Sequence, residues 1–194
     1  RGLLFQLYEN NGVIKRNKVK QIVKLIPKDE RKKLWGMGVK IGRYHIYLPK
    51  MLKPKAVSFR VSLWKMYHNL NKENQIPKSG LNFLTNIKFD KDFLLICGFE
   101  NFKEFFVRID ILEKLFLKIL DNTKNKKFTV NSEMMNLLGC SKENFYKLMN
   151  YMNYKRDKSI DTYVFKGEKK KREKIIRFDK KENPFNKLLS LNLK

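Results

Sequence analysis

Hydrophobic positions recur at intervals of three and four residues along most of the chain, so helices are predicted to dominate. Near the N-terminus this spacing predicts three helices, over 1–10, 17–26 and 29–35. A glycine or a proline follows each of them, and these residues commonly end helices.

A period of two replaces this spacing within residues 39–48, which therefore predict a strand. Its apolar face would carry Tyr44, Ile46 and Leu48, and its other face would carry Arg43, His45 and Tyr47. Because Val39 and Ile41 are out of phase with the apolar face, we expect a turn or bulge at Gly42, and a bulge would need a backbone conformation open mainly to glycine.

Two prolines follow this strand. Pro49 is predicted to end it, and Pro54 suits the first turn of a helix that runs to residue 71. Apolar side chains surround much of that helix, which predicts a central rather than a peripheral position. Residues 71–79 contain the clearest linker, and 92–97 are predicted to form a short helix that Gly98 ends.

The last third of the chain shows a recognisable order of elements. A long amphipathic helix, an extended segment, two short helices joined at Gly139-Cys140 and two extended runs are predicted at 109–122, 128–130, 132–138, 141–152, 162–165 and 174–178. The charged loop 166–173 would join the two extended runs as a hairpin. This is the order of a winged helix.

The predicted fold class is therefore α+β and mostly helical, with a short β element and a winged-helix-like C-terminal domain. We expect four segments: a helical region (1–75) with its β element (39–48) and central helix (54–71), a connecting segment (76–108), the winged-helix-like domain (109–180) and a C-terminal tail (181–194). The tail carries apolar positions that predict a docking helix or a frayed terminus.

Charge changes this picture more than any other property. The 194 residues hold 44 Lys and Arg against 19 Asp and Glu, a net charge of +25. Such an excess favours a polyanionic partner, and nucleic acid is the commonest one. An AT-rich genome would explain the preference for Lys over Arg, but it does not explain the excess of Lys over Glu.

Other chemistry is poorly represented. Cys97 and Cys140 stand alone, and His45 and His68 have no acidic or thiol neighbours at metal-ligand spacing. No apolar run is long enough to cross a bilayer, so we expect no membrane partner and a reducing, cytoplasmic setting. The chain contains no Gly-Lys dipeptide and hence no phosphate loop, and no nucleophile with its base is evident. We expect no catalytic residue, cofactor or metal in this fragment.

Three groups of basic residues are candidate nucleic-acid contacts. The first lies on and after the predicted strand, where aromatic and basic side chains could stack on bases and meet phosphates: Arg43, His45, Tyr47, Lys50, Lys53 and Lys55. The second is the outward face of the predicted recognition helix: Lys142, Asn144, Lys147 and Tyr151. The third is the predicted wing and its approach: Lys155, Arg156, Lys169, Lys170, Lys171, Arg172 and Lys174. For each group the alternative is an ordinary solvated surface, and the first could instead pack against a neighbouring domain.

A family resemblance rests on the glycine- and proline-rich stretch, whose pattern is Leu34-x-Gly36-x-Gly38-Val39-Lys40-Ile41-Gly42-Arg43-x-x-Ile46-Tyr47-Leu48-Pro49-x-x-Leu52-Lys53-Pro54, followed by Leu63-Trp64. It resembles the region after the motor in alphaproteobacterial relatives of the mitochondrial Suv-type (suppressor of Var) helicases, which are superfamily-two ATP-dependent RNA helicases. The similarity extends back to 1–7 and forward through 107–113 to 137–141, and it is weak after Tyr154. It makes RNA the first candidate partner, with DNA as the second. The resemblance implies that the catalytic residues, ATP and magnesium belong to motor domains upstream of Arg1.

Three functions remain in competition after these observations. The leading hypothesis is an accessory region that guides a strand past a helicase motor in the same chain, and whose parent chain would be the enzyme. The alternative is a free-standing winged-helix DNA-binding protein such as a transcription regulator. A basic module that binds ribosomes or membrane surfaces is the third. An open reading frame that extends upstream into phosphate-loop and acidic motifs would decide for the helicase.

Overall fold

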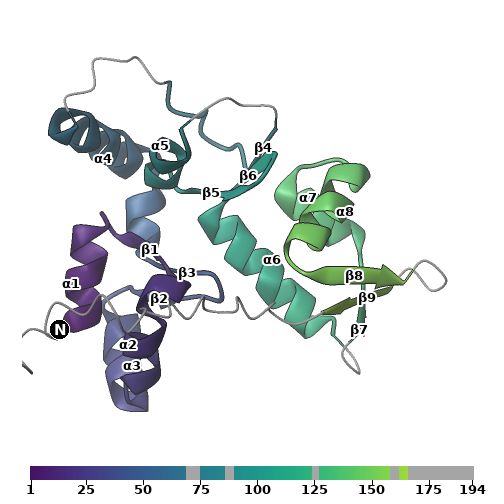
Figure 1. The fold of residues 1–194 in the computed structure, drawn as a ribbon, viewed down its shortest axis with the longest axis horizontal. Helices are drawn as coiled ribbons and strands as arrows, with labels where there is room; N and C mark the ends of the chain where they lie inside the picture. The colour runs from purple at the N-terminus through teal and green to yellow at the C-terminus, as the bar shows by residue number, and fades with distance from the viewer. Residues whose placement is uncertain (69–74, 86–89, 124–126, 158–161, 166–194) are drawn as a thin grey trace, which may run out of the picture.

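The computed structural model describes residues 1–68, 75–85, 90–123, 127–157 and 162–165. Within these residues the protein is a mixed α+β structure in which helices outnumber strands and all sheets are small and antiparallel (Figure 1). We divide it into an N-terminal unit (1–47), a middle unit (49–108) and a C-terminal unit (109–165).

The N-terminal unit packs its helices around one three-stranded sheet of order β1-β3-β2. Its elements are α1 (Gly2–Glu9), β1 (Val13–Lys15), the 3-10 helix η1 (Arg16–Val19), α2 (Lys20–Leu25), α3 (Lys28–Gly36), β2 (Lys40–Ile41) and β3 (His45–Tyr47). The core joins Leu7 of α1, Val23 of α2 and Ile46 of β3. The three predicted N-terminal helices are therefore confirmed.

The middle unit contains a second sheet, of order β4-β6-β5, within the range expected to be a connecting segment. Its elements are η2 (Pro49–Leu52), α4 (Pro54–Tyr67), β4 (Phe83–Thr85), α5 (Lys91–Ile96), β5 (Phe99–Phe102) and β6 (Phe105–Arg108). As predicted, β3 ends before Pro49 and Pro54 begins a helix; Pro49 also begins η2, which was not predicted. The central position predicted for α4 is wrong, because only one side of the helix is buried. Its other side exposes Phe59, Leu63, Met66 and Tyr67.

The C-terminal unit has the largest core and a sheet of order β7-β9-β8. Its elements are α6 (Ile109–Asp121), β7 (Lys127–Thr129), α7 (Ser132–Leu138), α8 (Lys142–Tyr151), β8 (Tyr154–Asp157) and β9 (Thr162–Phe165). Side-chain caps set the starts of α7 and α8: the Asn131 side chain accepts from the Met134 N–H, and the Ser141 hydroxyl accepts from the Asn144 N–H. Gly139, with a φ of 67°, ends α7.

The hairpin of the C-terminal unit differs from the prediction. β9 lies between β7 and β8, so both of its edges are paired and the pairing of 162–165 with 174–178 is wrong. The strand at 154–157 was missed because Lys155, Arg156 and Asp157 interrupt any apolar alternation. Residues 174–178 themselves lie outside the described residues.

Of the turn or bulge expected at Gly42, the turn is confirmed and the bulge is not found. Lys40–Ile41 forms a separate strand that pairs antiparallel with β3, so Gly42 begins the turn between two strands. Its φ is not positive, and conformational freedom is therefore not the reason for a glycine here. Figure 1 shows that α6 runs between this turn and the sheet of the C-terminal unit.

Candidate nucleic-acid interface

The turn between β2 and β3 is held by a carboxylate from α6. Glu113 Oε2 accepts the backbone N–H of Arg43 at 2.6 Å, and Oε1 accepts those of Tyr44 and His45 at 2.8 Å each. Edge-to-face contact between the rings of Tyr44 and Phe116, with centroids 5.9 Å apart, adds a second attachment to α6. These contacts fix the backbone from which the Arg43 side chain extends.

Gly42 leaves room for that carboxylate. A Cβ atom at this position would overlap the carboxyl carbon and both oxygens of Glu113. On the other side of the turn, Arg16 Nη1 donates to the Gly42 carbonyl at 2.7 Å. The N–H groups of the turn therefore bond to α6 of the C-terminal unit, and its Gly42 carbonyl bonds to η1 within the N-terminal unit.

His45 extends the same network into the middle unit. Its Nε2 lies 2.7 Å from Glu100 Oε2 on β5, and Lys15 Nζ on β1 donates to Glu100 Oε1 at 2.6 Å. Its Nδ1 lies 3.7 Å from Glu113 Oε1, which is an ion-pair distance. All three units thus meet at one charge cluster around the buried His45.

The ionisation of this cluster follows from its geometry. Burial lowers the pKa of His45, but the hydrogen bonds and charges of Glu100 and Glu113 outweigh burial and leave the pKa raised above its ordinary value. Burial raises the pKa of Glu100, yet His45 and Lys15 bring it below its ordinary value. The two carboxylates therefore favour the protonated form of His45.

The strand face predicted to carry a binding platform is therefore only partly available. His45 is 1% exposed and Tyr47 is 7% exposed, so the prediction that they lie on an open face is wrong. Burial raises the pKa of Tyr47 to about 12. Arg43 is exposed, as are Lys50, Lys53 and Lys55 at η2 and the start of α4.

Arg43 lines a hollow that is unusually basic. Among the described residues that line this cavity of about 180 Å³ are five cations and no carboxylate: Arg16, Lys20, Lys24, Arg31 and Arg43. Arg31 is held in place by hydrogen bonds from Nε and Nη2 to the carbonyls of Ile26 and Val23. We call this cavity the basic hollow, and its charge suits phosphate groups.

Arg43 also lines a second hollow, which is aromatic. This cavity, of about 290 Å³, is lined mainly by apolar side chains of α6 and the C-terminal sheet, including Phe116, Phe128, Tyr154 and Phe165. The Arg43 guanidinium lies 5.8 Å from the Phe116 ring centroid and 5.9 Å from that of Phe165. We call it the aromatic hollow, and together the two hollows form the Arg43 surface.

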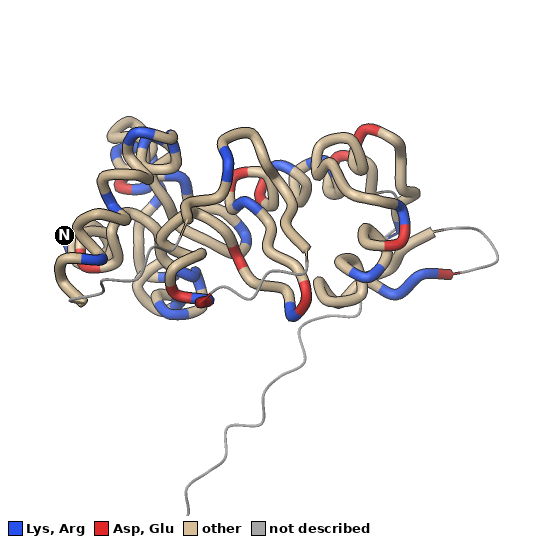
Figure 2. Tube along the Cα trace, turned by 90° about the horizontal axis from the view of Figure 1, so that it is seen from above, with Lys and Arg blue, Asp and Glu red and all other residues tan. Residues whose placement is uncertain are grey.

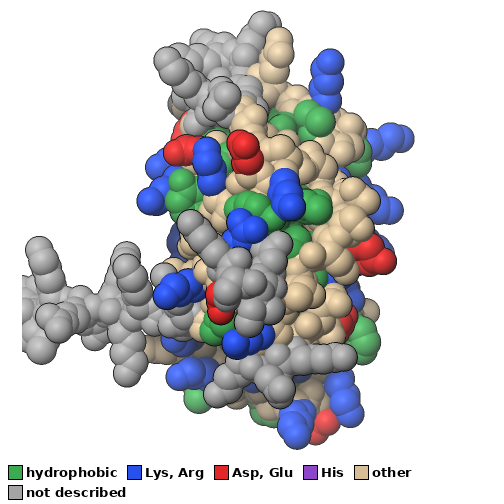
Figure 3. All heavy atoms as spheres, turned by 90° about the vertical axis from the view of Figure 1, so that its right-hand side faces the viewer, with side chains coloured by type: hydrophobic (Ala, Val, Ile, Leu, Met, Phe, Trp, Pro, Cys, Tyr) green, Lys and Arg blue, Asp and Glu red, His purple; other side chains and the backbone are tan. Residues whose placement is uncertain are grey.

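The face of α8 that was predicted to point outward is exposed only in part. α8 buries Phe145, Leu148 and Met149, while Lys142 and Lys147 are exposed. Asn144 and Tyr151 are half-buried. Tyr151 packs against Phe105, with ring centroids 6.0 Å apart, and Lys103 Nζ lies 5.0 Å from its centroid. Figure 3, which faces this unit, shows Lys and Arg side chains projecting around hydrophobic ones.

The predicted wing residues divide into two sets. Lys155 and Arg156 lie on β8 itself, and the Arg156 guanidinium lies 4.1 Å from the Tyr146 ring centroid. The remaining residues of this group lie outside the described residues: Lys169, Lys170, Lys171, Arg172 and Lys174. Their predicted contact with nucleic acid stays a prediction.

Sequence reasoning missed most of the basic hollow. Arg16, Lys20 and Lys24 recur every four residues, a spacing that places them on one side of η1 and α2. That signal was present but hard to single out, because Lys and Arg occur along the whole trace (Figure 2). The nearness of these residues to Arg43 could come only from the folded structure.

Comparison with family models, with curated proteins and with solved structures finds no match, so it assigns no family to this chain. Within the described residues, no group of three His, Cys, Asp or Glu side chains is arranged to hold a metal ion. The described helices also include none with the length and apolar character needed to span a membrane.

Proposed function

We propose that this chain is the nucleic-acid-binding accessory region of an ATP-dependent RNA helicase and that it guides the strand past a motor encoded upstream. The observation that carries the proposal is the Arg43 surface, where a basic hollow and an aromatic hollow share one arginine. Phosphates of a single strand would lie in the first and a base would stack in the second.

The proposal that the parent chain is a helicase is based on the family resemblance of residues 34–54. Three roles described above fall within that stretch: Gly42 admits the Glu113 carboxylate, Pro49 begins η2, and Pro54 begins α4. Glycine and proline at such positions are expected where the backbone of a turn must hold Arg43 in one place. ATP and magnesium belong to the parent chain in this proposal, because no phosphate loop occurs in these residues.

Salt-dependent binding tests the proposal directly. The chain should bind a random single-stranded RNA, and a double variant, Lys20→Gln with Lys24→Gln, should reduce the slope of log affinity against log salt by up to about two units. The control is Lys28→Gln with Lys32→Gln on α3, which removes the same charge from the same unit outside the basic hollow. Equal losses in both variants would refute the Arg43 surface as the binding site.

A second candidate is supported by the C-terminal unit. Its order of helix, strand, two helices and two strands, with Lys142 and Lys147 exposed on α8, favours a winged-helix class and a duplex DNA ligand. In that case a duplex should bind more tightly than a single strand, and Lys142→Gln with Lys147→Gln should remove the difference. Sequencing upstream of Arg1 separates the two candidates, because only the helicase requires motor motifs there.

A further inference from the structure

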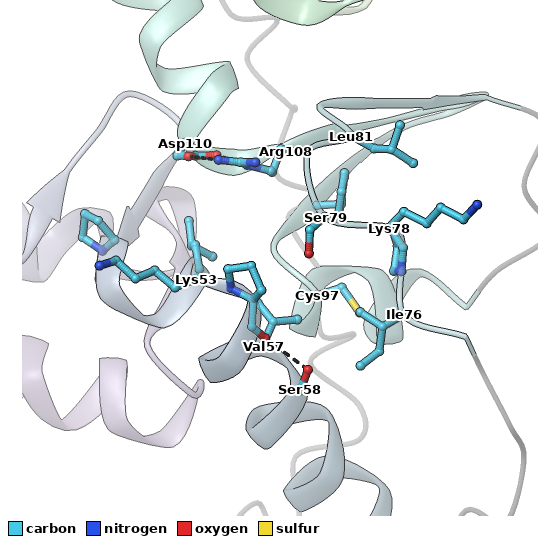
Figure 4. Close-up of a pocket in the computed structure, with 16 residues that line it drawn as sticks. Lys53, Val57, Ser58, Ile76, Lys78, Ser79, Leu81, Cys97, Arg108 and Asp110 are labelled. Carbon is cyan, nitrogen blue, oxygen red and sulfur yellow. Dashed lines mark hydrogen bonds and ion pairs between the residues drawn. The ribbon is translucent and has the colours of Figure 1, made fainter.

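A cavity of about 330 Å³ lies in the middle unit, apart from the Arg43 surface (Figure 4). One wall is the start of α4, another is the segment 76–81, and the third is the junction of β6 with α6. Its volume falls at the lower end of the range for small-ligand pockets, roughly 300–1,000 Å³. None of the residues of the Arg43 surface lines it.

The floor of this cavity is apolar. It is formed by the buried side chains of Val57 on α4, Cys97 after α5 and Phe99 on β5. Burial raises the pKa of the Cys97 thiol to about 12, so the sulfur is neutral and behaves as a small hydrophobic group. Pro54 and Pro77 stiffen two of the walls, because their φ angles are restricted.

The far end of the cavity is polar and planar. Arg108 Nε and Nη2 donate to Asp110 Oδ1 and Oδ2 at 2.7 and 2.6 Å, which makes a bidentate pair. Both side chains are partly exposed, at 30% and 18%. The pair therefore offers guanidinium donors and carboxylate acceptors to the edge of a planar ligand that enters over the apolar floor.

The rim adds positive charge on both sides. In Figure 4 the side chains of Lys53 and Lys78 extend away from the cavity in opposite directions. Because Asp110 is already paired with Arg108, the surroundings of the cavity are positive overall. An anionic chain that crossed the rim could contact one ammonium group before the cavity and the other after it.

We propose that this cavity accepts one unstacked nucleobase of a single strand, with the flanking phosphates on Lys53 and Lys78. The proposal rests on the proposed function, since it assigns a further subsite to the same strand. A base matches the cavity because its faces are apolar and its edge carries donors and acceptors. A free phosphate would leave the apolar floor without a partner, and an aliphatic ligand would leave the Arg108–Asp110 pair unused.

The test fills the cavity without changing its charge. Ser58 and Ser62 are both exposed on α4, and each hydroxyl donates at 3.1 Å to the carbonyl four residues earlier, but only Ser58 lines the cavity. Ser58→Trp should therefore block the cavity, and Ser62→Trp is its matched control. The probe is a single-stranded oligonucleotide that contains 2-aminopurine, whose fluorescence rises when it leaves the stack.

Wild type and Ser62→Trp should raise the fluorescence and bind the strand equally. Ser58→Trp should abolish the rise and weaken binding about tenfold, as the loss of one well-packed base contact implies. On an abasic strand of the same length, all three proteins should bind equally and more weakly than wild type binds the normal strand. Melting curves of both variants should match that of wild type.

One result would overturn this assignment while leaving the proposed function intact, namely equal binding and equal fluorescence for Ser58→Trp and Ser62→Trp. Equal binding of normal and abasic strands by wild type would count against both, because the aromatic hollow is also proposed to take a base. If wild type binds no strand at all, the nucleobase cavity and the proposed function are both refuted.

Discussion

Gly42→Ala should destabilise the protein through a residue far away in the sequence. The added Cβ would overlap the Glu113 carboxyl group, which must then move away from the turn. The end of the Glu113 side chain cannot move freely to relieve the clash, because both of its oxygens already accept backbone N–H groups of Arg43, Tyr44 and His45.

The magnitude follows from those three hydrogen bonds, which are 2.6 to 2.8 Å long. A hydrogen bond to a charged group contributes about 1.5 to 3 kcal/mol to stability. If the displaced carboxylate keeps one of the three, the loss is about 3 kcal/mol or more. For a chain of this size that loss lowers the melting temperature by roughly 6 to 12 °C.

Denaturant unfolding of Gly42→Ala, Glu113→Ala and the double variant measures this coupling. Since both single changes disrupt the same bonds, the double variant should lose clearly less than the sum of the two. Gly36→Ala is the control: Gly36 is helical, nothing lies within 4 Å of its added Cβ, and the change should be neutral or mildly stabilising. A loss below about 1 kcal/mol for Gly42→Ala, or additive losses, would refute the reasoning.

Two other predictions concern buried cations. Because the folded pKa of His45 is raised, its contribution to stability is complete below the unfolded pKa of about 6.5 and is lost as pH rises through the folded value. The unfolding free energy should therefore fall above about pH 6.5 in wild type and much less in His45→Gln, and parallel pH profiles would contradict this. Arg60 is 1% exposed, and within the described part of the chain only its Nη1 has a hydrogen-bond partner, the Met51 carbonyl. Arg60→Met should leave the unfolding free energy unchanged or higher in denaturant titrations, and a loss above about 2 kcal/mol would show that the buried charge is compensated.

The helices could be predicted from the sequence because their signals are local. Asn131 and Ser141 each cap an N–H group three residues later in the chain, and Gly139 ends α7. Such contacts lie within one turn of helix, so spacing alone reveals them. The apolar face of α8 was predicted correctly for the same reason.

The strands and the site depended on distant partners and were harder to predict. His45 looks like an exposed polar residue in its own strand, and only the distant carboxylates of Glu100 and Glu113 make its burial favourable. Arg43 was identified as a candidate contact, but the basic hollow beside it requires η1 and α2 to fold against the same turn. The expectation that alternate residues of β3 face solvent also fails, because all three residues of this strand are buried.

The attachment of the β2–β3 turn to Glu113 has a consequence for biosynthesis. Arg43 leaves the ribosome 70 residues before its acceptor does. At roughly 5 to 20 residues per second, the turn waits roughly 4 to 14 seconds with its N–H groups bonded only to water. The N-terminal unit therefore completes its structure only after α6 has emerged from the ribosome.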